Sequence, residues 1–470
     1  MTDFEGNDMK KRHSAFVAMG VAPVLLALAA CGGGDGDGDG GADADGNGEG
    51  GGFTAEASGA VDAWAFDNAD DVGQARLDHA EETLGDLEIQ LDPTSFDAQK
   101  FTTRMASGDV PDVVQMDRRY VGTYAAQDLI QPLDQCFEAH EVTPDERWYP
   151  FVVDDVRWND QVWATPQFYQ PPAVLLNKDV MDAAGVTNEQ IDTSDLEVLL
   201  PAVEAMYAES GGNPTTLGFD PQPTGQVTLW LLGMGGTLTD EEGAPTLDDP
   251  ANAAAIEHVK QIIDAQGGYA PYKSFTDSFD FFGEQNQYVA DQVGAQINAQ
   301  WYPNVLSPYI DEVQLNAVPF KNADGENFAV AGGTAFVIPA GAENPDGACA
   351  WMVEVTSLEA WEAAGAARAA TLEENNGVFT GLFTGSPEAD QTIRDTYLEP
   401  TGNEGMDQVI ETYYEVLDYG QSVGASPVGQ EIVNELTNAM TAALLGDKTP
   451  EQALTDAQDT VMRAYESNVD

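Results

Sequence analysis

The chain has 470 residues, of which 81 are acidic and 18 basic, and its formal net charge at pH 7 is −63. Such a charge repels the phosphate backbone and argues against a nucleic-acid-binding protein. The acidic residues are spread along the chain, which indicates a salt-adapted, halophilic surface rather than a store for cations. The hydrophobic fraction of 43% is typical of a globular protein, and the length favours two domains or lobes.

A short apolar segment lies near the N-terminus, at residues 15–30, directly after three basic residues at 10–12. It contains Pro23 and is shorter than the roughly 20 residues that span a bilayer, so a permanent transmembrane helix is the weaker interpretation. The pattern instead predicts a signal peptide over residues 1–30. The residues Leu-Ala-Ala before Cys31 resemble the lipobox of bacterial lipoproteins, so we expect lipidation of Cys31.

A segment rich in glycine and acidic residues follows at 31–58 and predicts a flexible, self-repelling tether. Its Asp-Gly repeat at 35–40 is similar to the start of a calcium loop. However, Gly46 stands where that loop needs a glutamate, which favours a linker. We therefore expect an exported protein, anchored by lipid to the outer face of the cytoplasmic membrane. Met9 suits the start of a signal peptide better than Met1.

From residue 59 onward, the sequence predicts alternating strands and helices. Periodicity predicts strands over 61–66, 87–91 and 110–116, a helix over 70–84, and a second helix through Phe101 and Met105. This alternation is typical of a parallel α/β sheet.

Capping signals predict further helices. Asp249 and Pro250 combine an N-cap with a proline at the first helical position. Apolar residues over 428–440 recur at helical spacing before Gly446, and residues 449–452 form a capping box that opens a last helix.

Six groups of segments resemble, in order, the extracellular solute-binding proteins of ABC importers, and in particular the sugar-binding group that includes maltose-binding protein. They lie at 105–114 with 129–134, 162–166 with 176–179, 235–238, 249–250, 332–339 and 445–454. The resemblance covers residues 59–470. It implies an α/β, two-lobed periplasmic-binding-protein-like fold (a Venus flytrap) with hinge crossings and a ligand cleft between the lobes.

The resemblance also implies how the chain divides. Lobe one would comprise residues 59–167 and 330–372, and lobe two residues 168–329 and 373–470. Cys136 and Cys349 then fall in the same lobe, which leaves a disulfide open without establishing it. The histidines and cysteines form no cluster in the sequence, so we expect no metal site and no cofactor.

Sugar sites combine aromatic rings that stack on the sugar with polar side chains that bind its hydroxyls. In parallel sheets, ligands meet the loops at the carboxyl ends of strands. These rules and the resemblance select Trp64, Phe66, Asp67, Asp117, Arg118, Tyr120, Phe168, Tyr169, Gln170, Trp230, Trp301, Tyr302, Gly333 and Thr334. Gln170 stands where maltose-binding protein carries a ligand-binding glutamate. Trp301 matches the family's tryptophan in lobe two.

Arg118 and Arg119 are unusual in so acidic a chain. They suit sugar hydroxyls or an anionic ligand, while an ion pair within the lobe is the alternative for one of them. Between Pro427 and Leu445 the chain lacks the aromatic pair of maltose-binding protein. This difference favours a smaller sugar or a different glycan.

The sequence therefore predicts a monomeric substrate-binding component that captures a sugar or oligosaccharide and delivers it to an ABC permease. We expect no enzyme, because the sequence has no nucleophile elbow, Walker loop or metal-ligand histidine pattern. Alternatives are another solute (a polyol phosphate, a polyamine or an iron chelate), a secreted glycan-active enzyme, and a structural surface protein.

Overall fold

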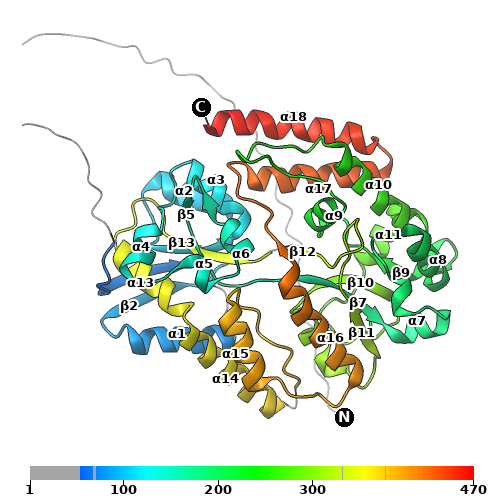
Figure 1. The fold of residues 1–470 in the computed structure, drawn as a ribbon, viewed down its shortest axis with the longest axis horizontal. Coiled ribbons are helices and arrows are strands. Elements are labelled where there is room, and N and C mark those ends of the chain that lie inside the picture. Colours follow the sequence, from blue (N-terminus) through cyan, green and yellow to red (C-terminus); the bar gives the residue numbers. More distant parts are fainter. Residues whose placement is uncertain (1–52, 67–69, 331, 376, 470) are drawn as a thin grey trace, which may run out of the picture. The chain divides into compact units, whose positions relative to one another are not determined.

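The computed structural model describes residues 53–66, 70–330, 332–375 and 377–469. These residues form a mixed α/β fold that contains two five-stranded sheets (Figure 1). The predicted signal peptide, Cys31, the tether as far as residue 52, and Asp67 lie outside the described residues. No helix within the described ranges is both long and apolar enough to cross a membrane.

The first sheet has the strand order β2-β1-β3-β13-β6. Its strands are β1 (Gly59–Trp64), β2 (Leu87–Asp92), β3 (Val113–Asp117), β6 (Thr165–Pro166) and β13 (Thr334–Val337). The first three strands are parallel and are connected by helices α1 (Asp71–Thr83) and α2 (Ala98–Ser107), which confirms the predicted alternation. The third strand begins later than predicted, after Pro111, which has no amide hydrogen to donate to a ladder.

The second sheet has the order β11-β7-β10-β9-β8. Its strands are β7 (Pro172–Asn177), β8 (Ala208–Ser210), β9 (Asn213–Asp220), β10 (Val293–Ala299) and β11 (Leu315–Val318). Strands β9 and β10 are parallel, so their carboxyl ends share one edge of the sheet. Every residue of β7 is buried, because this strand lies between β10 and β11 and is covered by helices.

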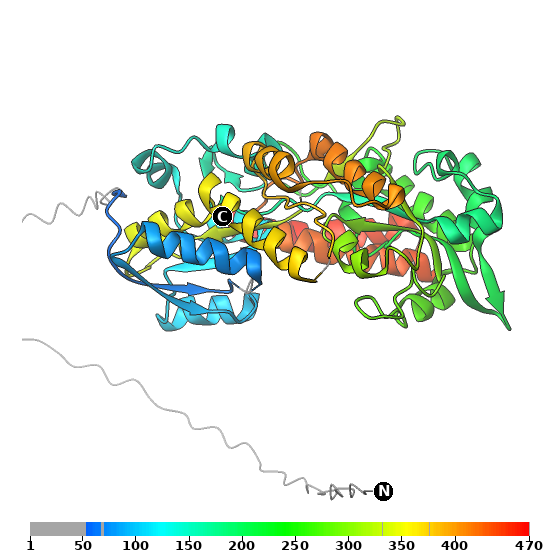
Figure 2. The ribbon, with the colours of Figure 1, turned by 90° about the horizontal axis from the view of Figure 1, so that it is seen from below.

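The other elements are short strands and helices around the two sheets (Figures 1 and 2). The short strands are β4 (Arg157–Trp158), β5 (Gln161–Val162), β12 (Ala329–Val330) and β14 (Gly420–Gln421). The helices are α3 (Val121–Ala126), α4 (Asp134–Ala139), α5 (Pro144–Arg147), α6 (Pro150–Asp154), α7 (Lys178–Ala184), α8 (Leu196–Met206), α9 (Val227–Gly233), α10 (Pro250–Asp264), α11 (Tyr269–Thr276), α12 (Tyr302–Leu306), α13 (Pro345–Val355), α14 (Leu358–Asn375), α15 (Pro387–Tyr397), α16 (Glu404–Glu415), α17 (Gly429–Leu445) and α18 (Pro450–Val469).

The predicted helix signals are confirmed. The Asp249 carboxylate accepts a hydrogen bond from the amide of Ala251 (2.7 Å) and caps α10. At the start of α18, Thr449 and Gln452 exchange side-chain to backbone hydrogen bonds of 3.2 and 3.3 Å, as a capping box requires. Helix α17 ends at Gly446, whose φ of 77° suits a residue without a Cβ.

The chain passes repeatedly between the two sheets. Residues 167–171 connect β6 of the first sheet to β7 of the second. Strand β12 leads back to β13 in the first sheet and pairs in parallel with β14. Helices α13 and α14 pack against β1 and α1, whereas α16 packs against β11. These crossings join the two sheets into one body and form the base of the site described below.

Each sheet has its own hydrophobic core. A disulfide between Cys136 in α4 and Cys349 in α13 ties two helices across the first core, with a Cα–Cα distance of 5.8 Å. Both cysteines are fully buried. A smaller apolar cluster includes Val72, Trp361 and Leu382.

Removing this disulfide should destabilise the protein, because the bond closes a loop of 213 residues in the unfolded chain. We expect Cys136→Ala with Cys349→Ala to lower the free energy of unfolding by about 2–4 kcal/mol, as measured by urea titration in high salt. Reductant should destabilise the parent protein but leave the double variant unchanged. Detection of two free thiols by mass spectrometry under non-reducing conditions would contradict the pairing.

Candidate ligand site

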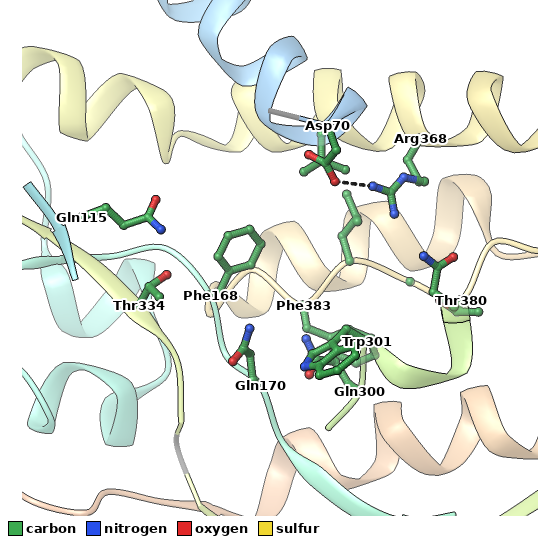
Figure 3. A pocket seen from close by; sticks show the side chains of 14 residues that line it. Asp70, Gln115, Phe168, Gln170, Gln300, Trp301, Thr334, Arg368, Thr380 and Phe383 are labelled. Atoms are coloured by element: carbon green, nitrogen blue, oxygen red, sulfur yellow. Dashed lines mark hydrogen bonds and ion pairs between the residues drawn. The ribbon is translucent and has the colours of Figure 1, made fainter. Parts of the chain in front are cut away.

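A cavity of about 360 Å³ lies where the two sheets and the crossing segments meet (Figure 3). The first sheet contributes Gln115 and Thr334, and the segment after β10 contributes Gln300 and Trp301. Further lining residues are Phe168 and Gln170 from the crossing between β6 and β7, together with Asp70, Val72, Asn304, Arg368, Thr380, Gly381, Leu382 and Phe383. Because both sheets supply walls, the cavity has the position of a cleft between two lobes.

The polar lining consists mainly of uncharged amides and hydroxyls. Six side chains are of this kind: Gln115, Gln170, Gln300, Asn304, Thr334 and Thr380. Two of their buried oxygens, Gln300 Oε1 and Thr334 Oγ1, have no hydrogen-bond partner among the described residues. A buried polar atom without a partner costs about 1–3 kcal/mol. A ligand that donates hydroxyl hydrogens to these oxygens would remove that cost.

The aromatic lining differs in exposure. The Trp301 side chain follows the carboxyl end of β10 and is 38% exposed, so part of its indole ring is accessible (Figure 3). Phe168 packs edge-on against Trp361, with ring centroids 5.3 Å apart. The Arg76 guanidinium lies near both rings, 3.9 Å from the Trp361 centroid and 5.6 Å from the Phe168 centroid. Packing therefore fixes Phe168, while Trp301 offers a partly open surface for stacking.

The cation in the lining is neutralised by carboxylates. Arg368 donates three hydrogen bonds to Asp71, of 2.7, 2.8 and 3.0 Å, and one of 2.7 Å to Asp70. Burial opposes ionisation of Asp71, but the contacts with Arg368 hold its pKa below the usual range. Arg368 thus faces two carboxylates, and an anionic ligand near it would meet net negative charge.

Four of the residues predicted from sequence line this cavity: Phe168, Gln170, Trp301 and Thr334. Gly333 lies beside them and has a structural reason to be glycine. A Cβ at this position would be 2.2 Å from the carbonyl oxygen of Phe168 and 2.7 Å from Nη1 of Arg118. The close approach of the two crossings therefore requires a residue without a side chain.

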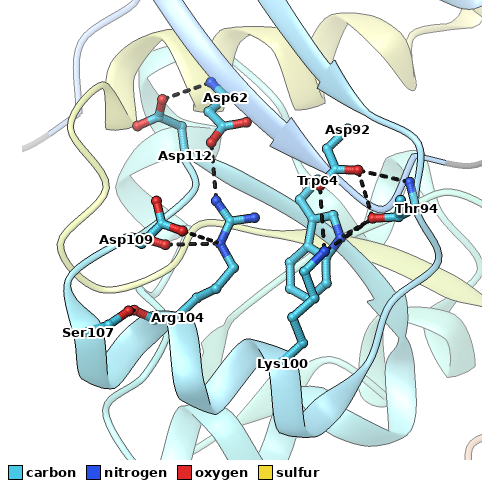
Figure 4. A network of polar contacts seen from close by, with 9 residues as sticks. All are labelled: Asp62, Trp64, Asp92, Thr94, Lys100, Arg104, Ser107, Asp109 and Asp112. Carbon is cyan, nitrogen blue, oxygen red and sulfur yellow. Dashed lines mark hydrogen bonds and ion pairs between the residues drawn. The ribbon is translucent and has the colours of Figure 1, made fainter.

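Trp64 and Phe66 are buried in the first core and do not line the cavity. The Trp64 indole donates to Thr94 Oγ1 (3.2 Å), and its ring is covered by Lys100 and Arg104, whose cationic groups lie 4.6 and 5.3 Å from it (Figure 4). These contacts account for a tryptophan at the end of β1 by packing and cation–π interaction.

Five other predicted residues also lie away from the cavity lining: Asp117, Tyr120, Tyr169, Trp230 and Tyr302. Asp117 pairs with Arg119 at 3.2 Å. Trp230 is fully buried and donates to the carbonyl of Pro221 (2.8 Å). The tryptophans assigned from sequence to packing or surface, at positions 148, 158, 163, 351 and 361, are also absent from the lining.

Arg118 is buried at the crossings, where it pairs with Asp155 (Nε–Oδ2, 3.3 Å). Its Nη1 donates to the carbonyl of Phe168, and its amide donates to the carbonyl of Gly333 (3.1 Å). Asp155 in turn accepts hydrogen bonds from Ser422 Oγ (2.6 Å) and from a neighbouring amide (2.9 Å). Burial raises the pKa of Asp155 to about 6, an effect that the nearby guanidinium opposes. Of the two roles that the sequence left open for Arg118, the structure shows the ion pair.

Sequence reasoning missed several lining residues. Gln115 and Gln300 carried a usable signal, because one interrupts an apolar strand and the other precedes Trp301. Arg368 and the segment 380–383 carried none, since α14 and the following loop reach the cavity only through tertiary packing.

Two α/β units around a polar cavity are the architecture of a two-lobed binding protein. The profile of the family described as bacterial extracellular solute-binding protein matches residues 72–360, which is more than half of the chain. The chain therefore belongs to this family.

Solved structures share the fold at low sequence identity. A solute-binding protein of an ABC transporter from Thermotoga lettingae, bound to α-D-tagatose, is 18% identical with a TM-score of 0.65 over 86% of this chain and 99% of its own. An ABC substrate-binding protein from Listeria monocytogenes in complex with cycloalternan is 15% identical with a TM-score of 0.67 over 87% and 99%. The sugar-binding protein MalE from Xanthomonas citri is 14% identical with a TM-score of 0.66 over 87% and 98%.

Replacing Arg118 should strongly destabilise the protein, because Arg118→Ala leaves the Asp155 carboxylate buried without its counter-charge. We expect the free energy of unfolding at pH 8 to fall by about 3–5 kcal/mol in urea titrations. Arg119→Ala is the matched control, since its pair with Asp117 is partly exposed and its loss should cost about 1 kcal/mol or less. Equal losses in the two variants would contradict the role of Arg118 at the crossings.

The Asp390 carboxylate braces the loop that carries Phe383, because it accepts hydrogen bonds from the amide (2.7 Å) and hydroxyl (2.8 Å) of Thr384. Burial raises the pKa of Asp390 to about 7. The folded protein therefore holds this proton more tightly than the unfolded chain, and its contribution to stability should fall as pH rises from about 4 to about 7.

Asp390→Asn keeps an oxygen for both hydrogen bonds but cannot ionise. In urea titrations at high and constant salt, the variant should lose less stability than the parent between pH 4 and pH 7. Parallel pH profiles for the two proteins would contradict the assignment.

Proposed function

We propose that this protein is the lipid-anchored substrate-binding component of an ABC importer and that it captures an uncharged sugar or oligosaccharide. The observation that carries the proposal is the cavity between the two sheets, in which six uncharged amide and hydroxyl side chains surround the partly exposed indole of Trp301. Aromatic rings stack on the apolar faces of sugars, and amides and hydroxyls bind the hydroxyl groups.

The relatives of known structure support this ligand class. Their described ligands include tagatose, cycloalternan and mannotriose, all of which are sugars. For this chain we propose Phe168, Gln170, Trp301 and Thr334 as ligand contacts, together with Gln300, which the sequence had not indicated. The other residues that the sequence selected remain predictions.

Capture would work by closure of two lobes, for which we keep the boundaries 59–167 with 330–372 and 168–329 with 373–470. A ligand that touches both lobes favours the closed state through contacts absent from the open state. The closed protein would then present its surface to the membrane permease as a monomer. Lipid at Cys31 and the acidic tether would keep it near that partner at the outer face of the cytoplasmic membrane.

The charges in the cavity disfavour the other solutes. A polyol phosphate needs an available cation, but Arg368 is engaged by two carboxylates and Arg118 by Asp155. A polyamine needs available carboxylates, but Asp70 is engaged by Arg368. We also propose that the protein is not an enzyme, since its relatives of known structure are described as binding proteins.

Calorimetric titration in high salt tests the proposal, with neutral mono- and oligosaccharides, sugar phosphates and polyamines as ligands. We expect a neutral sugar to bind and Trp301→Ala to weaken its affinity at least about tenfold, because the variant loses the stacking surface. Leu445→Ala is the control, since this 52% exposed side chain lies at the end of α17 and outside the cavity lining. Binding of only charged solutes would contradict the proposal.

A further inference from the structure

An aromatic cluster continues from the ligand cavity onto the protein surface. Phe282 is 71% exposed, the highest value among the large hydrophobic side chains of the described residues. Its ring is nearly parallel to that of Trp301, at 17° with centroids 6.1 Å apart. Phe281 stands edge-on to both rings, at centroid distances of 5.1 and 6.2 Å. The accessible indole of the cavity is thus one part of a larger aromatic platform.

Buried side chains hold the aromatic platform in a fixed position. Tyr302 is buried against Phe281, with centroids 4.4 Å apart, and its hydroxyl donates to the carbonyl of Phe281 (3.0 Å). Gln287 donates to the same hydroxyl (2.8 Å). The loop that presents Phe282 is therefore fixed by buried polar contacts. Such preorganisation lowers the entropic cost of binding.

A second cavity, of about 280 Å³, is lined in part by Phe281. It lies at the carboxyl end of β9, beside Gln296 of the parallel strand β10, which continues toward Trp301. Its walls include Asp220, Gln222, Gln296, Tyr272 and Phe281. Phe281 thus lines this cavity and contacts Trp301, which lines the first cavity.

The second cavity has polar walls that suit hydroxyl groups. The buried Asp220 carboxylate accepts hydrogen bonds from the Tyr272 hydroxyl, from Gln296 (2.6 Å) and from the Gln222 amide (2.9 Å). Lys273 at this cavity is already paired with Asp277. A negative, tyrosine-rich wall without an available cation favours an uncharged polyhydroxylated group over an anion.

From this arrangement we infer that the ligand is an oligosaccharide that extends beyond the first cavity, stacks on Phe282 and places a further sugar unit in the second cavity. The inference rests on the proposed sugar-binding function and specifies its ligand class. A monosaccharide would fill the first cavity alone and would leave Phe282 exposed. Continuity of the aromatic surface from Trp301 to Phe282 makes the longer ligand the better match.

The inference predicts that affinity rises with chain length and that Phe282 carries part of the rise. Calorimetry in high salt would use glucose through maltotetraose and mannose through mannotriose. We expect Phe282→Ala to weaken binding of the longest sugar about three- to tenfold, as loss of one aromatic contact does, while leaving the shortest bound member unchanged. Gln222→Ala in the second cavity should act in the same direction. Leu445→Ala, another exposed apolar side chain, should have no effect.

The outcomes separate this inference from the proposed function. If a sugar binds with an affinity that does not depend on chain length or on Phe282, the extended site is wrong while the sugar-binding function stands. If Phe282→Ala weakens the shortest and the longest sugars equally, the residue belongs to the first cavity and the extension is likewise overturned. If no member of either series binds, the extension falls together with the proposed function for these sugars.

Discussion

The buried ion pair between Arg118 and Asp155 is the interaction on which the rest of the site depends. Its guanidinium donates to the carbonyl of Phe168 at the first crossing, and its carboxylate accepts from Ser422 beyond β14. The main-chain amide of Arg118 donates to the carbonyl of Gly333 at the second crossing. Burying two charges is costly, and the cost is offset only when hydrogen bonds satisfy the remaining atoms. The crossings provide those hydrogen bonds, and the pair therefore fixes the relative positions of segments far apart in sequence.

The predominance of uncharged polar groups in the cavity lining is related to the small number of basic residues in the chain. In a chain with only 18 basic residues, Arg118 and Arg368 are each paired with carboxylates, while Arg76 is fully buried behind Phe168 and outside the lining. The amides and hydroxyls of the lining are then left as the groups that can bind a ligand. The predicted salt-adapted surface and the proposed neutral-sugar site are thus compatible, because the proposed ligand contacts do not depend on exposed charge.

Much of the fold was predictable because it depends on local signals. Strand and helix periodicity gave the parallel start of the first sheet, and Asp249, Gly446 and Thr449 gave helix ends that the structure confirms. The site was predictable only where a residue follows a strand or lies on a crossing, as with Trp301 and Gln170. Arg368 and Phe383 could not be found this way, because tertiary packing of α14 and its following loop brings them to the cavity. The same rule that selected Trp301 also selected Trp64, whose ring is covered by Lys100 and Arg104.

A crystal structure of the protein with its best-binding neutral sugar tests the central claim most directly. We predict one sugar ring stacked on the indole of Trp301, with its hydroxyls bonded to Gln300 and Thr334, and Arg118 still paired with Asp155. A sugar bound away from the space between the two sheets, or Arg118 released from Asp155 to contact the ligand, would contradict this description of the site.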